Sequence, residues 1–345
     1  MNTKYLPNEP VNIILLNFNG STDTIECINS IMLSDYDNIE ITIVDNNSST
    51  HDFNILSQYI NDSFRNLYVY EFTDLNFHLT KKIGFSNLET RINLIRSNQN
   101  LGFANANNLG IDFGLKRFHN FYFILNNDTI ILKDTISGLM NFISQNPSYH
   151  ALIPQIRYYN QRDIIWNCGG FLKFYGKCDY LFPNKCIDNI QFQKIYDVDF
   201  VTGCALLINY NKTGKFSNKY FFGEEDFDFS IKQKRNNSKM ACLMSSLVFH
   251  KVNSTIDKSN SNNISRFYYY YLCRLLNFKL NFTGINRTFL FSLLIAKVIK
   301  DSFIIYNLNP YKCLKNIRYL FSTIAQTDLI DENIFLLYLN NYKWK

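Results

Sequence analysis

The first part of the chain alternates short apolar runs with stretches of helical periodicity. Apolar runs begin at residues 11–19, 39–44 and 121–125, and their length suits a buried strand better than a helix. Between them, residues 25–32 and 104–118 place apolar side chains three and four positions apart, as an amphipathic helix does. Strands that alternate with helices form parallel pairs through right-handed crossovers. The order therefore predicts an α/β fold with a doubly wound sheet.

Each of these strands ends in a cluster of polar residues. A single polar strand end usually forms a turn, because Asn and Asp hydrogen-bond their own backbone. In a doubly wound sheet, however, the carboxyl ends of the strands meet at one edge, where ligands bind. Three polar ends at one edge therefore favour a shared pocket over three unrelated turns. The clusters are Asn17-Phe18-Asn19, Asp45-Asn46-Asn47-Ser48 and Asn126-Asn127-Asp128.

The stretch GEEDFDFSIK, residues 223–232, carries four carboxylates within five positions. If it opens a helix, the amide dipole favours the anionic forms, and Asp226 and Asp228 point to different faces. One of these carboxylates can then face a cleft, as a general base requires, while its neighbours fix the helix start. The alternative is an acidic first turn on the protein surface.

His250 ends another apolar run, SSLVFHK, where a histidine is more often structural than a ligand. With Asp128 from a separate strand end, it could hold a hard divalent cation whose shell phosphate oxygens complete. Gly203 lies within a strand expected at residues 198–208. A glycine in a strand predicts a bulge or a close backbone approach to a ligand.

Other segments carry weaker predictions. Asp23 followed by Glu26 resembles a capping box. Residues 70–95 predict an additional hairpin or helix between two strands of the sheet. Helical periodicity in the tail predicts three helices, at residues 266–280, 286–308 and 331–342.

Positive charge is concentrated in the tail. Residues 1–265 hold 24 Lys and Arg against 25 Asp and Glu, whereas residues 266–345 hold 11 against 4, a net charge of +7. These cations are too sparse for the basic face that nucleic acid requires, so no nucleic-acid partner is expected. A basic, aromatic and partly amphipathic tail fits an anionic membrane surface, and a solvated helical bundle is the alternative.

The cysteines and the apolar runs exclude further classes. Eight cysteines without a CxxC pair predict reduced thiols in a cytosolic protein instead of a zinc or redox site. No run reaches the roughly 18 apolar residues of a membrane span, and the first residues lack the pattern of a signal peptide.

Seven motifs in order resemble family 2 inverting glycosyltransferases of the GT-A fold, in particular the bacterial rhamnosyltransferase and galactofuranosyltransferase-like branch. The resemblance runs from about Val11 to Lys251 and continues weakly to about Phe282. Its motifs are ILLNFNG (14–20), IVDNNSS (43–49), NQNLGFANANNLGI (98–111), LNNDT (125–129), VTGCALLI (201–208), EEDFDFSIK (224–232) and VFHK (248–251), followed by YYYYLCRLLNF (268–278).

The resemblance implies a role for individual residues. Asp226 would be the catalytic base, and Asp128 and His250 would hold Mn²⁺ or Mg²⁺ on the donor diphosphate. Asp45 would contact the nucleotide base, and Gly203 and Glu225 would lie on the acceptor side. The remaining residues implied to bind the nucleotide sugar are Asn17, Asn19, Asn47, Asn100, Gly102, Phe103, Asn108, Asn126 and Asn127.

Two positions depart from the family pattern. Asn126 replaces the first Asp of an Asp-x-Asp motif, which predicts weaker metal binding, although its amide can still bond a ribose. Lys232 replaces an Arg, which substitutes a point charge for a bidentate fork.

A rival class, the nucleotidyltransferases, usually has a Gly-rich basic loop after the first strand, whereas NFNGSTDT contains no Lys or Arg.

Taken together, these features predict a GT-A domain at residues 1–255 and a helical region at residues 256–345. The expected activity is inverting transfer from dTDP-rhamnose or a UDP-hexose to a polysaccharide or lipid-linked acceptor. The expected location is cytoplasmic, on the inner face of a bacterial membrane, with the tail contacting the membrane or a second copy of the chain. The alternative is a non-catalytic module that binds nucleotide sugars or glycans on the same fold.

Overall fold

A computed structural model describes residues 9–64, 66–73, 75–83, 91–173, 177–190, 193–252 and 263–340. The predicted domain boundary after residue 255 and part of the region 70–95 lie outside these residues.

A twelve-stranded mixed sheet forms the centre of the molecule. Its parallel part contains β1 (Val11–Asn17), β2 (Ile39–Asp45), β5 (Arg91–Ser97), β3 (Leu67–Thr73) and β6 (Phe121–Asn126), with β1 between β2 and β6. Beyond β6 the order continues through β13 (Ala205–Asn209), β8 (Tyr149–Tyr158), β14 (Lys239–His250) and β12 (Ile195–Val198). The short strands β7 (Thr129–Ile131) and β9 (Ile165–Asn167) pair with β14 and β8, while β10 (Gly170–Leu172) and β11 (Cys178–Tyr180) form a separate pair.

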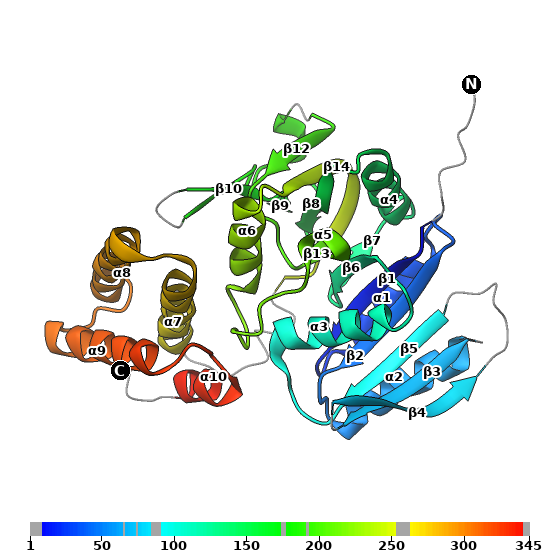
Figure 1. Cartoon of the computed structure of the whole chain (residues 1–345), viewed down its shortest axis with the longest axis horizontal. Helices are drawn as coiled ribbons and strands as arrows, with labels where there is room; N and C mark the ends of the chain where they lie inside the picture. The colour runs from blue at the N-terminus through cyan, green and yellow to red at the C-terminus, as the bar shows by residue number, and fades with distance from the viewer. Residues whose placement is uncertain are drawn as a thin grey trace.

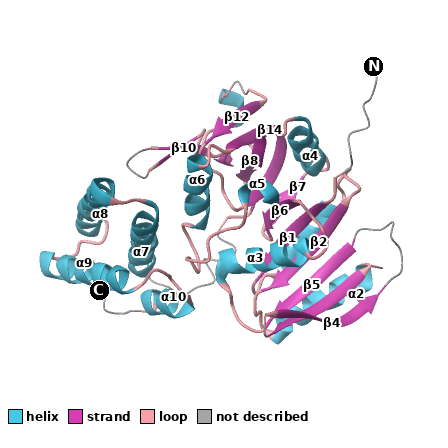
Figure 2. Cartoon of the chain, viewed as in Figure 1, coloured by secondary structure: helices cyan, strands magenta, loops and turns pink. Residues whose placement is uncertain are grey.

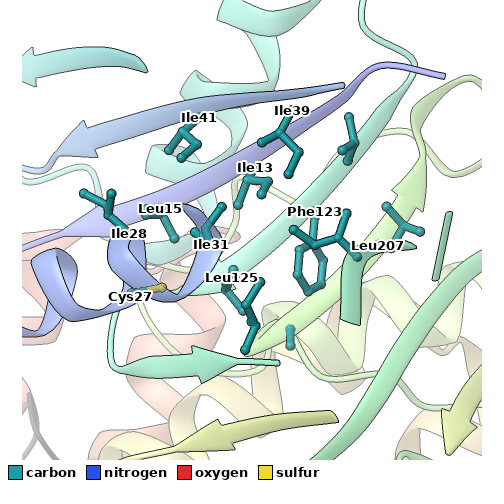
Figure 3. Packing of buried hydrophobic residues seen from close by; sticks show 14 of the residues in the cluster. Ile13, Leu15, Cys27, Ile28, Ile31, Ile39, Ile41, Phe123, Leu125 and Leu207 are labelled. Carbon is teal, nitrogen blue, oxygen red and sulfur yellow. The ribbon is translucent and has the colours of Figure 1, made fainter. Parts of the chain in front are cut away.

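Helices cover both faces of this sheet (Figure 2). Alternate residues of β1 point to opposite faces, and both faces are buried. Ile13 and Leu15 pack with apolar residues of α1 (Ser21–Met32), α2 (Thr50–Ser63) and α4 (Thr135–Gln145), as Figure 3 shows for α1. Ile14 packs on the other face with residues of α3 (Gly102–Leu115) and α6 (Glu225–Arg235). The predicted α/β fold is therefore confirmed.

The region 70–95 contains the predicted hairpin. Strand β4 (Asn76–Ile83) pairs antiparallel with β3 at the edge of the sheet. The capping box predicted at Asp23 and Glu26 is wrong, because Gly20 occupies the N-cap of α1. Both carboxylates instead contact Nζ of Lys251, at 2.7 Å and 2.6 Å. This contact joins the end of β14 to α1.

The prediction of a single strand at residues 198–208 is also wrong. The chain forms β12, leaves the sheet, and re-enters it as β13. Phe200 packs against Tyr180 and Phe227 between the two strands. Gly203 lies just before β13, and a Cβ there would come within 3.1 Å of the Phe103 ring. The close approach that the glycine predicts is therefore to a side chain of α3.

Between β11 and β12 lies a 3-10 helix, Ile187–Asn189, and β13 leads into a short helix, α5 (Tyr210–Thr213).

The tail folds into four helices, one more than predicted. They are α7 (Asn263–Asn281), α8 (Gly284–Ile304), α9 (Pro310–Gln326) and α10 (Glu332–Leu339), which gather beside α6 (Figure 1). The missed helix α9 has a clear start, because the Asn309 side chain accepts a hydrogen bond from Lys312 N and Pro310 follows the cap. These helices share one hydrophobic cluster with Tyr220, which precedes α6.

Among the described helices, none combines the length and the apolar composition that a bilayer crossing requires. All eight cysteines are free thiols. One face of α8 is nevertheless apolar and exposed over its whole length, including Ile285, Phe289, Leu293, Ile299 and Phe303. Its opposite stripe of Leu290, Leu294 and Val298 packs into the helical cluster.

Candidate active site

The carboxyl ends of β1, β2 and β6 meet at one edge of the sheet. In the pairing register, Asn17 lies opposite Asp45, and Leu16 lies opposite Asn126. Nδ2 of Asn17 donates to Oδ1 of Asp45 at 2.9 Å. The three polar strand ends therefore form one continuous polar region, as the parallel topology predicts.

Asp45 is at the centre of a closed network. Asn17 also donates to Ser48 Oγ at 3.1 Å and to Asp52 Oδ2 at 3.0 Å, and the backbone N of Ser48 donates to Asp45 Oδ2 at 3.3 Å. The Asp45 side chain is fully buried, and this burial raises the pKa of its carboxyl above the ordinary value. Its protein partners fix Asp45 beneath the sheet edge, so contact with a nucleotide base stays a prediction.

Asn19 and Asn47 lie on the outer side of this network. Both have positive φ, at 52° and 66°, a conformation that Asn tolerates better than most residues. Oδ1 of Asn19 accepts from the backbone N of Ser49 at 2.9 Å. Asn47 is exposed, which leaves its amide accessible to a ligand.

Asn46 is not among the residues predicted to bind the donor, and it fixes the start of α3. Its Nδ2 donates to Asn100 Oδ1 at 2.8 Å, and its Oδ1 accepts from Leu101 N at 2.8 Å. Asn100 Oδ1 also accepts from Gly102 N at 2.9 Å. Gly102 has φ +75°, and a Cβ there would lie 2.1 Å from the carbonyl oxygen of Phe221.

Two other residues predicted to bind the donor hold the chain segment before α6. The backbone N of Phe103 donates to Phe221 O at 2.8 Å. Asn108 forms a reciprocal pair with the backbone of Phe216, donating to its oxygen at 3.0 Å and accepting from its nitrogen at 3.1 Å. Both polar ends of Asn108 are therefore occupied by protein, and a contact with a sugar stays a prediction.

The segment after β6 positions Asp128. Asn127 Nδ2 donates to Thr24 Oγ1 at 2.9 Å, and Asn126 N donates to Cys204 O at 2.8 Å. Asp128 then lies next to His250, with Oδ1 3.2 Å from Nε2. The Trp166 ring packs edge-on against the His250 ring with centroids 4.5 Å apart. Two strand ends distant in sequence thus bring a carboxylate and an imidazole together.

This pair has a geometry that suits a divalent cation. Two ligands about 2.1 Å from an ion and at right angles to each other are about 3 Å apart, close to the observed separation. Burial lowers the pKa of His250, but the contacts with Cys204 and the Asp128 carboxylate have the larger opposite effect and raise the pKa to about 10. A cation would replace that proton. Within the described ranges, no three His, Cys, Asp or Glu side chains are grouped to hold a metal alone.

Gly203 and Cys204 connect this pair to Asp226. The Asp226 carboxylate accepts hydrogen bonds from the backbone N of Phe227, at 2.9 Å, and from the backbone of Gly203. The thiol of the next residue, Cys204, lies beside the His250 side chain. Consecutive residues of the chain therefore contact the predicted base and the predicted metal ligand, so the three predicted groups lie in one region.

The other carboxylates of α6 have different environments. Asp228 is fully buried, and it contacts Lys232 Nζ at 2.6 Å and Asn281 Nδ2 at 2.7 Å. Burial raises the pKa of Glu224 to about 7, of Glu225 to about 8 and of Asp226 to about 6. Asp226 is half-buried, so part of its side chain can reach a substrate, as a base requires.

The structure adds Trp166 and Arg274 to the site. Arg274 on α7 pairs with Glu224, with Nη2 and Oε1 2.8 Å apart. The repeated Tyr residues around Arg274 are a visible sequence feature, but only the tertiary structure identifies the partner of the arginine.

No protein-family model matches this sequence, and no curated protein matches it. Among solved structures, GalNAc-T7 with UDP, GalNAc and Mn²⁺ aligns with a TM-score of 0.51 and 15% identity, covering 76% of this chain and 48% of that one. The chain thus spans about half the length of GalNAc-T7. A Pyrobaculum calidifontis mannosyltransferase with GDP-Man and Mn²⁺ aligns at TM-score 0.49 and 11% identity, over 94% and 88% of the two chains. S. aureus TarS residues 1–349 align with a TM-score of 0.49 and 12% identity, and the alignment covers 96% of this chain and 81% of that one. The similarity to GalNAc-T7 identifies the GT-A fold for this chain.

Proposed function

We propose that the protein is a glycosyltransferase that uses a nucleotide-diphosphate sugar. The observation that carries the proposal is the contact of Gly203 with Asp226 and of Cys204 with His250, which brings a base next to a candidate metal pair. The site lies at the carboxyl edge of the sheet, where doubly wound folds bind nucleotides. The GalNAc-T7 structure, which has the same fold, contains UDP, GalNAc and Mn²⁺.

Asp128 and His250 are the residues that would hold the metal in this proposal. A mixed carboxylate and imidazole pair favours Mn²⁺ over Mg²⁺, which prefers oxygen ligands alone. When bound, the ion supplies positive charge that stabilises the departing diphosphate. The donor is dTDP-rhamnose or a UDP-hexose such as UDP-galactofuranose, with Asn19, Asn47 and Asn126 nearest to the nucleotide.

The transfer proceeds with inversion in one displacement. Asp226 accepts the proton of an acceptor hydroxyl while its oxygen attacks the anomeric carbon, and the bond from that carbon to the diphosphate breaks. Gly203 orients Asp226 through its backbone hydrogen bond. Glu225, whose Oε2 has no hydrogen-bond partner among the described side chains and backbone, faces the acceptor in this scheme.

The acceptor is a cell-surface polysaccharide or a lipid-linked glycan, extended at the inner face of a bacterial membrane. The exposed face of α8 carries Lys297 and Lys300 beside its apolar side chains, and an amphipathic face with basic residues fits an anionic bilayer surface. A second copy of the chain is the other partner for this face. Residues 1–255 form the catalytic domain and residues 256–345 the helical region in this proposal.

A donor screen followed by a transfer assay tests the function. Thermal shift with Mn²⁺ and a panel of nucleotide sugars should show selective stabilisation by one donor. With that donor, Asp226→Asn should lower kcat at least about 100-fold and leave donor affinity unchanged. Asp112→Asn, at an exposed pair with Lys215, is the matched control. Donor binding without hydrolysis or transfer by the wild type would instead identify a binding module.

A further inference from the structure

Helix α6 begins at a residue in an unfavourable backbone conformation. Glu224 occupies the N-cap position with φ 69°, in the left-handed region that non-glycine residues seldom adopt. Such a conformation persists where the surrounding structure holds it. Arg274 does so here, because its Nη2 lies 2.8 Å from Glu224 Oε1 and the two side chains are 8% and 4% exposed. Helix α7 therefore fixes the residue two positions before Asp226.

The same guanidinium also contacts the residue after Asp226. Its central carbon lies 3.9 Å from the centroid of the Phe227 ring, and Nη2 lies 3.3 Å from the hydroxyl of Tyr270. A planar guanidinium can stack on a ring and bond a carboxylate at once, which a lysine ammonium cannot do. One arginine side chain thus holds the residues on both sides of Asp226.

Two other contacts from α7 hold the same segment through neutral side chains, so they place no positive charge beside Asp226. Asn281 Nδ2 donates to Asp228 Oδ1 at 2.7 Å, and the Tyr269 hydroxyl donates to Phe222 O at 2.7 Å. Arg274 differs from both because it combines a positional contact with a buried positive charge.

We propose that Arg274 is a positioning residue for Asp226, setting the direction of the carboxylate and keeping it anionic at the pH of the reaction. Its catalytic consequence rests on the proposed function. The helical region is then part of the active site, because α7 supplies the side chain that prepares the base.

The charges around Asp226 agree with this role. Burial raises the pKa of Asp226, hydrogen bonds from Phe227 and Gly203 lower it, and Arg274 lowers it further. Other titratable and charged groups in this cluster come from α6 and the segment before it, β11, the residue before β13, α7 and the candidate metal pair. They are Glu224, Glu225, Asp228, Tyr220, Cys178, Tyr180, Cys204, Tyr269, Tyr270, Cys273, Arg274, Asp128 and His250.

Three variants separate positioning from general stability. Arg274→Met keeps the length of the side chain and removes the charge, Arg274→Lys keeps a charge without the fork, and Arg235→Met is the matched control. Arg235 also joins α6 to α7, donating through Nη1 to Asn281 Oδ1 at 3.3 Å, but it lies at the far end of α6. In Arg274→Met, kcat should fall about 100-fold with unchanged donor affinity, and the acid limb of kcat/KM should move up by about one pH unit or more.

Arg274→Lys should return the acid limb toward the wild-type position while kcat remains low. Arg235→Met should lower the melting temperature without moving the acid limb of the pH profile of kcat/KM. An acid limb that is unchanged in Arg274→Met, or a shift of equal size in Arg235→Met, would overturn the proposal.

A titration without turnover distinguishes this proposal from the proposed function. In full-length protein with carbon-13 at the aspartate carboxyls, Asp226→Asn assigns the Asp226 resonance, and its pKa should rise in Arg274→Met. Equal pKa values in the wild type and Arg274→Met would reject the role of Arg274 whatever the transfer assay gives. A raised pKa in a protein that transfers no sugar would reject only the glycosyltransferase.

Discussion

Nε2 of His250 lies 3.2 Å from Oδ1 of Asp128, although one residue ends β14 and the other follows β6. Strand β7, which begins directly after Asp128, pairs antiparallel with β14 and places Thr129 opposite His250. Lys251 N also donates to Asp128 O at 2.9 Å. The contact therefore depends on the pairing of β7 with β14, and it sets the first prediction.

Asp128→Asn should weaken metal activation, because cation affinity depends on the number of ligand charges. The Mn²⁺ concentration for half-maximal transfer should rise at least about tenfold, and EDTA should stop the wild-type reaction. Asn126→Asp, which adds a carboxylate at the same strand end, should lower that concentration. Initial rates measured against Mn²⁺ concentration check both variants, and equal activation of Asp128→Asn and the wild type would contradict the metal assignment.

Glu225→Gln should stabilise the protein at high pH. Burial raises the pKa of Glu225 from 4.5 to about 8, so between these values the folded state keeps a proton that the unfolded chain releases. Stability contributed by this group is therefore highest at low pH and falls as pH rises through that window. Glutamine stays neutral at every pH.

The measurement is the melting temperature at two pH values. Glu225→Gln should melt above the wild type at pH 8 and near it at pH 5. Glu71→Gln, at an exposed position on β3, should differ from the wild type in melting temperature by the same amount at both pH values. A pH-independent difference for Glu225→Gln would mean that the carboxyl is not buried in the folded protein.

Gly102→Ala should separate α3 from the segment before α6. The added Cβ would lie 2.1 Å from the Phe221 carbonyl oxygen, and φ +75° disfavours alanine. We expect a loss of about 1–3 kcal/mol in the free energy of unfolding, measured by denaturant titration. Gly138→Ala is the control, because its Cβ would meet only the Ser246 hydroxyl group, and a side chain can move.

Phe289→Asp together with Phe303→Asp should reduce binding to anionic vesicles. Both residues lie on the exposed face of α8, where a charge opposes insertion among lipid chains. Co-sedimentation with phosphatidylserine vesicles measures the effect, and Phe118→Asp, which changes a more exposed aromatic residue away from α8, is the control. Unchanged sedimentation with a loss of dimer on gel filtration would assign this face to a second copy of the chain.

The parallel core was predictable because its signals are local. Residues 11–19 and 39–44 show apolar runs with polar ends, and the pairing of Asn17 with Asp45 follows from parallel topology. The break between β12 and β13 was not predictable in this way. Phe200 is as apolar as a strand residue, but its partners are Tyr180 and Phe227 outside the sheet.

The environments of individual site residues were harder to predict. Asn46 and Asn47 are neighbours of the same type, yet one is buried and holds Asn100 while the other is exposed. Arg274 lies in a helix rich in aromatic residues, and its pairing with Glu224 depends on how α7 packs against α6. Sequence patterns specify the faces of elements, whereas such pairings require the tertiary arrangement.

Tyr220 is fully buried among α7, α8, α9 and α10, although it belongs to the segment between β13 and α6. Backbone pairing adds to this, because Tyr220 forms a bridge with Ile330 and Ile330 N donates to Lys219 O at 2.9 Å. A chimera that received the last four helices from another protein of this fold would therefore place a foreign surface against Tyr220. Such a chimera would have to carry the stretch around Tyr220 together with the tail, so the unit that packs as one body is discontinuous in the chain.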